Sequence, residues 1–470
     1  MDLNVLIVGG GIHGVGLLHD LAARKIPGVH LVEQARLASG TSSRTTKLAH
    51  GGLRYLEHPA QWGLVREALR ERALLLRNLP ELVSPLRFVL PNFKDGRPAW
   101  LVRLGLALYD RLAQQGGLPK ARRLSKTEIA QMAPYLRRER LEQDVQAGFL
   151  YYDAQMLDDV IVRVAARAAT RLGATYVEQT RVEAIAPDGR GFRVSLASPE
   201  GRQVVTSRVV VNATGAWANA NLLMWGYSPR VPCLLNVGSH LVFASEAVSA
   251  RPEDCAATLL QHDDGRVLFF IPWQGQWLLG TTESVLDGTP DKWECPPGDR
   301  EYLLRVAERN LALIEPARHT REFFCGIRTL PLPRRAATLR TRSVPDGWRD
   351  QPFASPWYLR TADRDVSALS REAVVDEVAP NLLTIYGGKF TTYRALCERV
   401  GDRLAARLGR PTPSGTHLKE NWFLDEIKRA EPELFRSDPS LRGSDLHAKG
   451  VRRAALDDVA VRSAFPPAAR

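Results

Sequence analysis

Short apolar runs and amphipathic stretches alternate along the chain, and their order predicts an α/β protein. Residues 5–8 form an uninterrupted apolar run and residues 29–32 a second short run, as is typical of buried parallel strands. Between them, apolar positions repeat at helical spacing until about residue 25. The chain therefore begins with a predicted strand–helix–strand unit. Two later apolar runs, 209–211 and 382–385, are each followed by glycine and are expected to be buried strands as well.

The middle of the chain carries two further patterns. Segments 62–79 and 157–172 have apolar residues every three or four positions with charges between them, which predicts two amphipathic helices. Three short strand-like runs follow, at 240–243, 267–271 and 277–280, and turn residues separate them. Such spacing indicates an antiparallel sheet in a second domain.

A glycine motif lies between the first strand and the helix after it. Gly9, Gly11 and Gly14 form a Gly-x-Gly-x-x-Gly pattern, and Glu33 follows nineteen residues after Gly14 at the tip of the second strand. In this setting the glycines permit a tight turn, close approach of the backbone to a pyrophosphate, and close packing of helix on strand. Glu33 is expected to accept hydrogen bonds from ribose hydroxyls, which disfavours the 2′-phosphate of NADP. The motif predicts a dinucleotide site.

Composition limits the number of domains and the kind of partner only in part. A chain of 470 residues is long enough for two or three domains. Its 64 Lys and Arg exceed its 52 Asp and Glu, a net charge of +12, which favours an anionic partner, whether phosphorylated ligand, nucleic acid or acidic lipid. An arginine-rich genome explains the excess equally well.

The five cysteines show no metal-ligand spacing and no two are close in sequence, so we expect neither zinc nor a disulfide framework, but reduced thiols in the cytoplasm. We find no signal-peptide pattern and no apolar run of about 18 residues, so membrane contact is expected to be peripheral.

Five blocks of sequence, taken in order, resemble the FAD-dependent glycerol-3-phosphate dehydrogenases. They are LASGTSSRTTKLAHGGLRYLE at 37–57, PLRFVLP at 85–91, GSH at 238–240, GTTE at 280–283 and GGKFTTYR at 387–394. The resemblance implies a Rossmann-like FAD-binding domain of the glutathione-reductase and D-amino-acid-oxidase type, with an inserted α+β antiparallel-sheet domain. We therefore expect the FAD-binding domain in 1–80, 147–225 and 372–409, the substrate domain in 81–146 and 226–371, and a small, partly helical appendage in 410–470.

The same resemblance implies a reaction. Glycerol 3-phosphate would be oxidised to dihydroxyacetone phosphate, with hydride passing to the flavin N5 and electrons on to a quinone. Oxygen as acceptor and another phosphorylated polyol as substrate stay open.

The phosphate group requires fixed cations. Arg54, Tyr55, Arg328 and Lys389 match positions that contact substrate in the family. Arg371 is a further candidate, although it follows Arg328 by forty-three residues and an apparent insertion at 334–358 lies between them.

Two histidines are candidates for the proton acceptor, because a neutral imidazole titrates near working pH. His50 precedes a Gly-Gly pair, and His240 begins an apolar run. Arg328 is expected to stabilise a developing alkoxide, with Lys389 as a second catalytic cation. In addition to Gly9, Gly11, Gly14 and Glu33, the expected FAD contacts are Gln34, Thr41, Ser42, Ser43, Thr46, Lys47, Leu48, Gly215, Gly387, Gly388, Thr391 and Thr392.

One segment suggests a lipid surface. Residues 100–112 combine Trp100 and leucines with periodic arginines, as interfacial helices do, although a buried helix is an equal expectation. Because quinones dissolve in the bilayer, we expect peripheral attachment to the cytoplasmic face of the inner membrane.

Two other functions stay open. An amine or D-amino-acid oxidase would share the cofactor domain but would need no phosphate cluster. A basic RNA-binding flavoprotein is the second alternative, but the cations are dispersed and no RNA-binding motif is present, so no nucleic-acid partner is expected. A homodimer stays open.

Overall fold

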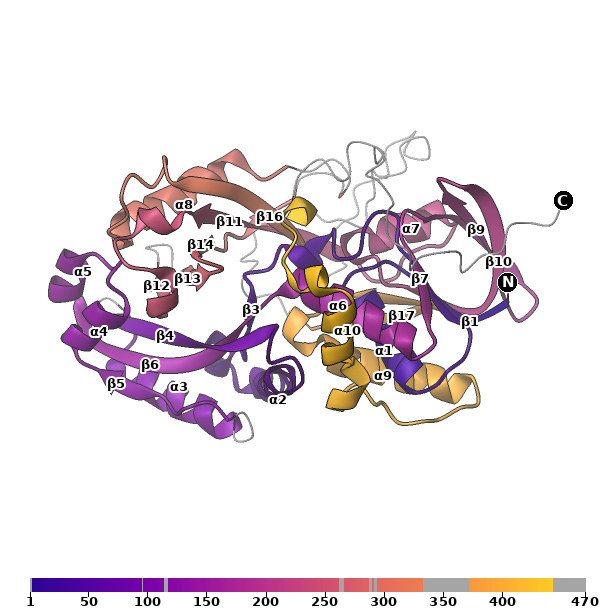
Figure 1. The fold of residues 1–470 in the computed structure, drawn as a ribbon, viewed down its shortest axis with the longest axis horizontal. Coiled ribbons are helices and arrows are strands. Elements are labelled where there is room, and N and C mark those ends of the chain that lie inside the picture. The colour runs from indigo at the N-terminus through magenta and orange to yellow at the C-terminus, as the bar shows by residue number, and fades with distance from the viewer. Residues whose placement is uncertain are drawn as a thin grey trace.

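The computed structural model describes residues 2–94, 96–113, 117–261, 266–286, 290, 294–332 and 372–442. The strands in this part of the chain form an eight-stranded and a ten-stranded sheet. They lie beside each other, each with its own layer of helices (Figure 1).

The eight-stranded sheet is built around the predicted strand–helix–strand unit. Strands β18, β10, β1, β2 and β7 pair in parallel in that order, and β17 joins β18 antiparallel. Strands β8 and β9 form a hairpin that extends from β10. The bounds are β1 Asp2–Val8, β2 Val29–Val32, β7 Thr175–Val177, β8 Arg181–Asp188, β9 Gly191–Ser198, β10 Gly201–Asn212, β17 Val374–Ala379 and β18 Leu382–Tyr386.

Alternate residues of β1 enter different hydrophobic cores, as the period of a strand requires. Val5 and Ile7 pack with three helices, α1 Ile12–Ala23, α6 Asp158–Arg171 and α9 Tyr393–Arg407. Leu6 and Val8 pack on the other face with β8, β9 and α7 Ala218–Met224. The central sheet is therefore covered on both faces, which explains the fully apolar runs in its strands.

The described part of the expected appendage is packed into this main core. Trp422, Ile427 and Leu441 belong to the same apolar cluster as α1 and α6. Helix α10 Leu424–Ala430 lies beside α6 (Figure 1). Arg24, the C-cap of α1, also donates to the Thr412 carbonyl. This segment, to residue 442, is part of the domain that carries the glycine motif.

The ten-stranded sheet follows the order β15-β11-β14-β13-β12-β4-β6-β3, with β16 paired to β11 and β5 to β6. The expected domain boundary at residue 147 falls inside β6, which pairs along its length with β4. The bounds are β3 Leu48–Ala49, β4 Val83–Phe93, β5 Arg122–Leu124, β6 Val145–Met156, β11 Cys233–Phe243, β12 Ala257–Gln261, β13 Val267–Trp273, β14 Gln276–Gly280, β15 Ser284–Val285 and β16 Thr320–Pro331.

The predicted helices form at the expected places. The 62–79 pattern is α2 Trp62–Asn78, and the 157–172 pattern is α6. The 100–112 segment is α3 Ala99–Leu112. In the described residues, no helix is both long and apolar enough to cross a bilayer. The other helices are α4 Lys126–Met132, α5 Arg138–Gln143 and α8 Pro297–Asn310.

The expectation of reduced thiols is wrong for one pair. Cys295 and Cys325 form a disulfide with their Cα atoms 5.6 Å apart. Thirty residues separate them in sequence, and only the return of the chain through α8 to β16 brings them together. Sequence spacing carries no signal for this contact. The other three cysteines are free and buried.

Buried histidines make stability depend on pH. Burial lowers the pKa values of His19 and His30 from 6.5 to about 4. Between these values the unfolded chain binds more protons than the folded protein, so the free energy of unfolding falls as pH drops from about 6.5 to 4. We expect the melting temperature to fall across this range. His30→Gln should weaken this dependence, because it removes one of the titrating groups. The glutamine amide keeps a partner for Thr175 Oγ1, which lies 2.7 Å from His30 Nδ1. If calorimetry gave the same change of melting temperature with pH for the variant and the wild type, this prediction would be contradicted.

Candidate active site

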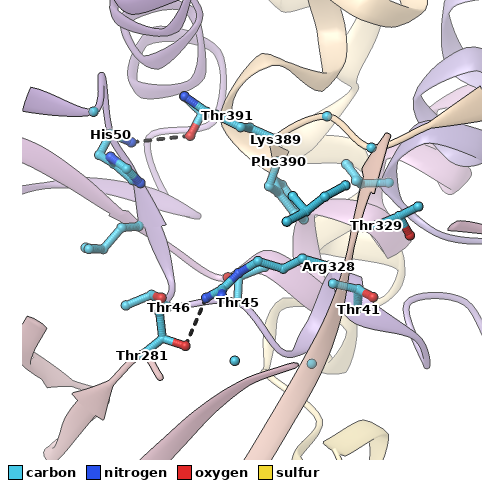
Figure 2. Close-up of a pocket in the computed structure, with 18 of the residues that line it drawn as sticks. Thr41, Thr45, Thr46, His50, Thr281, Arg328, Thr329, Lys389, Phe390 and Thr391 are labelled. Atoms are coloured by element: carbon cyan, nitrogen blue, oxygen red, sulfur yellow. Dashed lines mark hydrogen bonds between the residues drawn. The ribbon is translucent and has the colours of Figure 1, made fainter. Parts of the chain in front are cut away.

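A cavity of about 1430 Å³ is lined by residues from both sheets. It runs from the glycine motif to the side chains of Arg328 and Lys389 and on to helix α3. Figure 2 shows that the labelled residues reach it from β16, from the turn after β14, from the β3 region and from the segment before α9.

The glycine motif shapes one end of the cavity. A Cβ on Gly9, whose φ is +111°, would lie 2.7 Å from the Ala213 carbonyl oxygen, and one on Gly14 would lie 1.9 Å from the Gly9 carbonyl oxygen. Both positions therefore require glycine. Gly11 is the N-cap of α1, and Gly11, Ile12 and His13 line the cavity. The N-terminus of this helix therefore faces the cavity and suits a pyrophosphate.

Glu33 lies at the expected place at the tip of β2. Its carboxylate accepts the Gly10 N–H at 2.6 Å and the Ala35 N–H at 2.8 Å. Burial raises its pKa despite these bonds. The side chain is thus held by the turn itself, with its carboxylate on the cavity wall.

Most of the expected cofactor residues line the cavity. Gly9, Gly11, Glu33, Gln34, Thr41, Ser42, Thr46, Leu48, Gly215, Gly387, Gly388 and Thr391 all do so. Gly14, Ser43, Lys47 and Thr392 do not belong to its described wall. Arg371 and the 334–358 segment lie outside the described residues.

Lys47 forms a buried ion pair that was not predicted from the sequence. Its fully buried Nζ donates to Asp158 at 2.8 and 2.9 Å and to the Ser43 carbonyl at 2.5 Å. The ion pair holds the 41–47 loop against α6, and Lys47 does not belong to the described cavity wall. The expected contact of Lys47 with the cofactor stays a prediction.

Arg328 projects from β16 and is fixed by three groups. Its guanidinium donates to Asn236 Oδ1 at 2.8 Å, to Thr281 Oγ1 at 2.9 Å and to the Thr282 carbonyl at 3.3 Å. A Cβ on Gly238 would lie 2.5 Å from Arg328 Nη2, so the glycine of the Gly-Ser-His block makes room for the guanidinium. Asn236 and Thr281 escaped the sequence analysis, although Thr281 lies within the 280–283 block.

Lys389, Arg54 and Tyr55 border the same cavity as Arg328. The Lys389 Nζ lies 3.9 Å from the centroid of the Tyr55 ring, a distance suited to a cation–π contact. Three cations predicted from different parts of the sequence thus meet at one cavity.

The two candidate histidines have different surroundings. His50 follows β3, its backbone N–H donates to Thr391 Oγ1 at 3.3 Å, and its ring faces the space that Arg328 also faces (Figure 2). His240 stacks on Phe324 at 4.9 Å, with Nε2 3.0 Å from Thr46 Oγ1. Burial, followed by the positive charge of Arg328, holds the pKa of His240 well below its usual value, which makes it a weak base.

The comparisons with known proteins decide the family. The model of the FAD-dependent oxidoreductases matches residues 4–349. Glycerol-3-phosphate dehydrogenase of Pseudomonas aeruginosa is 34% identical over 436 residues, covering 90% of this chain and 77% of the relative. The chain belongs to the FAD-dependent glycerol-3-phosphate dehydrogenase family.

The chain is similar to two further proteins. D-erythritol 1-phosphate dehydrogenase of Brucella abortus is 34% identical over 410 residues, covering 85% of this chain and 73% of the relative. The solved glycerol-3-phosphate dehydrogenase of Bacillus halodurans, complexed with FAD, has a TM-score of 0.65 and 24% identity, and it covers 95% of this chain and 76% of that one. It supports the fold.

The cofactor of this family member is FAD, and its own residues fit the group. Gly9 and Gly11 line the cavity at the N-terminus of α1, where backbone N–H groups would hold a pyrophosphate. His13 lies beside Gly388, and its buried Nε2 has no hydrogen-bond partner among the described residues. Burial lowers the pKa of His13 to about 4. A neutral imidazole there suits a polar edge of the bound cofactor.

Proposed function

We propose that the protein oxidises sn-glycerol 3-phosphate to dihydroxyacetone phosphate and passes the electrons to a quinone. One observation carries the proposal. The cavity that is lined by the glycine motif is also lined by Arg54, Arg328, Lys389 and His50. An amine substrate would not require three cations at this place.

Each side chain has a role that its position supports. Lys389 and Arg54 attract the phosphate dianion, and the guanidinium of Arg328 orients substrate oxygens with its fixed donors. His50 accepts the proton of the C2 hydroxyl as hydrogen leaves C2 as hydride, which produces the ketone. Bound FAD supplies the hydride acceptor. Arg328 also stabilises the negative charge that develops on the C2 oxygen.

His50 is preferred to His240 as the proton acceptor. His240 has one ring nitrogen directed at Thr46 and a pKa held low by burial and neighbouring cations. A base with a low pKa gains little from taking up a proton at neutral pH. We infer instead that His240 orients Thr46.

Anaerobic reduction of the flavin tests the substrate. Protein loaded with FAD is mixed with glycerol 3-phosphate, D-erythritol 1-phosphate, glycine or a D-amino acid, and loss of the oxidised flavin absorbance is followed. We expect rapid bleaching by glycerol 3-phosphate and none by the amino acids. Faster bleaching by D-erythritol 1-phosphate would assign that longer polyol phosphate as the substrate. It is a candidate because D-erythritol 1-phosphate dehydrogenase is as similar to this chain as the Pseudomonas aeruginosa relative is. Bleaching by an amino acid alone would overturn the proposal.

The path toward a quinone is proposed to end at helix α3. The cavity continues along Leu101, Leu104 and Leu108 of this helix. Trp100 is 68% exposed and Leu104 is 59% exposed, whereas Leu106 and Tyr109 on the other side are buried. An apolar outer face at the mouth of the cavity, with Arg97 and Arg103 beside it, suits an anionic lipid surface.

Vesicle binding measures this attachment. The double change Trp100→Ala and Leu104→Ala is expected to weaken binding to anionic vesicles at least about tenfold, because it removes roughly 2–4 kcal/mol of apolar contact. Val204→Ala is the matched control, since Val204 is 56% exposed on β10. If the wild-type protein at low salt does not sediment with the vesicles, the proposed attachment fails.

A further inference from the structure

A buried polar cluster contacts the backbone next to His50, and no role was assigned to it from the sequence. Tyr109 of α3, Asp153 of β6 and Arg72 of α2 meet there, and all three side chains are buried. The Tyr109 hydroxyl donates to the Asp153 carboxylate at 2.8 and 2.9 Å. Arg72 donates to Asp153 at 2.5 Å and to the Tyr152 carbonyl at 3.1 Å. Elements that are distant in sequence thus converge on one carboxylate.

This cluster binds the residue that follows His50. The Gly51 N–H donates to Tyr109 Oη at 2.8 Å, with Asp153 Oδ1 at 3.4 Å. The preceding amide, that of His50, donates to Thr391. Two consecutive peptide groups are therefore held from different sides. A Cβ on Gly51 would lie 2.6 Å from Tyr109 Oη, so the backbone passes as close to the hydroxyl as glycine allows.

The chemistry of Tyr109 suits a fixed acceptor. Burial, reinforced by the negative charge of Asp153, raises its pKa well above 10, so the phenol stays protonated at any working pH. Because its proton is committed to Asp153, an oxygen lone pair is left for the Gly51 N–H. Arg72 balances the carboxylate charge, which would otherwise be costly to bury.

We propose that Tyr109, supported by Asp153 and Arg72, is a positioning residue that fixes the His50–Gly51 backbone and thereby the His50 imidazole in the cavity. The inference rests on the proposed role of His50. It also gives α3 a second role, because the helix borders the cavity mouth and also carries the tyrosine that holds the segment with the base.

The test compares Tyr109→Phe with Tyr135→Phe. Both replacements remove one buried hydroxyl. Tyr135 donates to the Ala256 carbonyl at 2.6 Å, and it does not line the cavity in the described part of the chain. The FAD-loaded variants are assayed for the rate of anaerobic flavin reduction by glycerol 3-phosphate, for the dissociation constant of that substrate, and for amide hydrogen exchange in peptides that cover residues 48–53.

For Tyr109→Phe we expect flavin reduction to slow roughly tenfold, because small misplacements of a reacting group are costly, with the substrate dissociation constant unchanged and exchange at 48–53 accelerated. Tyr135→Phe should change neither the rate nor this exchange. Equal slowing by both variants, or unchanged exchange at 48–53 in Tyr109→Phe, would overturn the inference. If Tyr109→Phe proves insoluble, Asp153→Asn replaces it with the same expected results.

The two proposals fail in different ways. If glycerol 3-phosphate does not reduce the flavin of the wild-type protein, the proposed function fails. The exchange measurement needs no substrate, and it then decides alone whether Tyr109 holds the His50–Gly51 segment.

Discussion

Replacing Arg328 with alanine is expected to lower kcat/KM for glycerol 3-phosphate by roughly 10²–10³-fold, through both a higher KM and a lower kcat. The guanidinium is held by Asn236, Thr281 and the Thr282 carbonyl, so it is already oriented before substrate binds. Such fixed donors stabilise developing charge without reorganisation, and their removal affects the transition state more than the ground state. Steady-state kinetics with an artificial electron acceptor measure the effect.

Two further variants sharpen this result. Arg328→Lys keeps the positive charge but loses the forked donors, and we expect it to recover only part of the activity. Arg318→Ala removes an exposed arginine that pairs with Glu315 and should behave as wild type. Unchanged kinetics in Arg328→Ala would remove this residue from the site.

The second large effect is expected from Gly14→Ala. The new Cβ would lie 1.9 Å from the Gly9 carbonyl oxygen, so α1 and the turn before it must separate. Overpacking typically costs about 1–3 kcal/mol, and we expect this backbone clash at the upper end of that range, equivalent to roughly a hundredfold loss of FAD affinity or of folded protein. We expect purified Gly14→Ala to be colourless or insoluble, as measured by flavin absorbance and circular dichroism.

A control for this change exists on α2. A Cβ on Gly63 would meet nothing within 4 Å, so Gly63→Ala should keep full FAD content. A Gly14→Ala protein with normal flavin content and stability would show that the turn tolerates a side chain, and would weaken the assignment of the pyrophosphate site.

The parts of the fold that sequence predicted are those that local pattern determines. The glycine turn, α1 and the apolar strands β1 and β2 follow from spacing alone, since a buried parallel strand and a tight turn each need particular residues. The expected domain boundary at residue 147 took no account of β6, which begins at Val145 and belongs to the ten-stranded sheet. Sheet membership depends on long-range pairing, which no local pattern records.

The candidate site divides in the same way. Arg54, Arg328 and Lys389 were predicted from short blocks, and all three border one cavity. The residues behind them were missed. Asp153 and Tyr109 acquire their position only when β6 and α3 pack together. The ion pair of Lys47 was also missed, because its partner Asp158 lies more than a hundred residues away in sequence. Partners of buried charges are a tertiary property.

The packing of residues 410–442 has a consequence for the preparation of shortened proteins. Truncation at residue 409 would uncover the surface that Trp422, Ile427 and Leu441 cover on α1 and α6, a loss of roughly 1.5–3 kcal/mol for each side chain. It would also release Arg442, which donates to Glu322 of β16 at 2.8 and 3.0 Å, six residues from Arg328. A shortened protein should therefore end after residue 442, because Arg442 binds β16, the strand that carries Arg328.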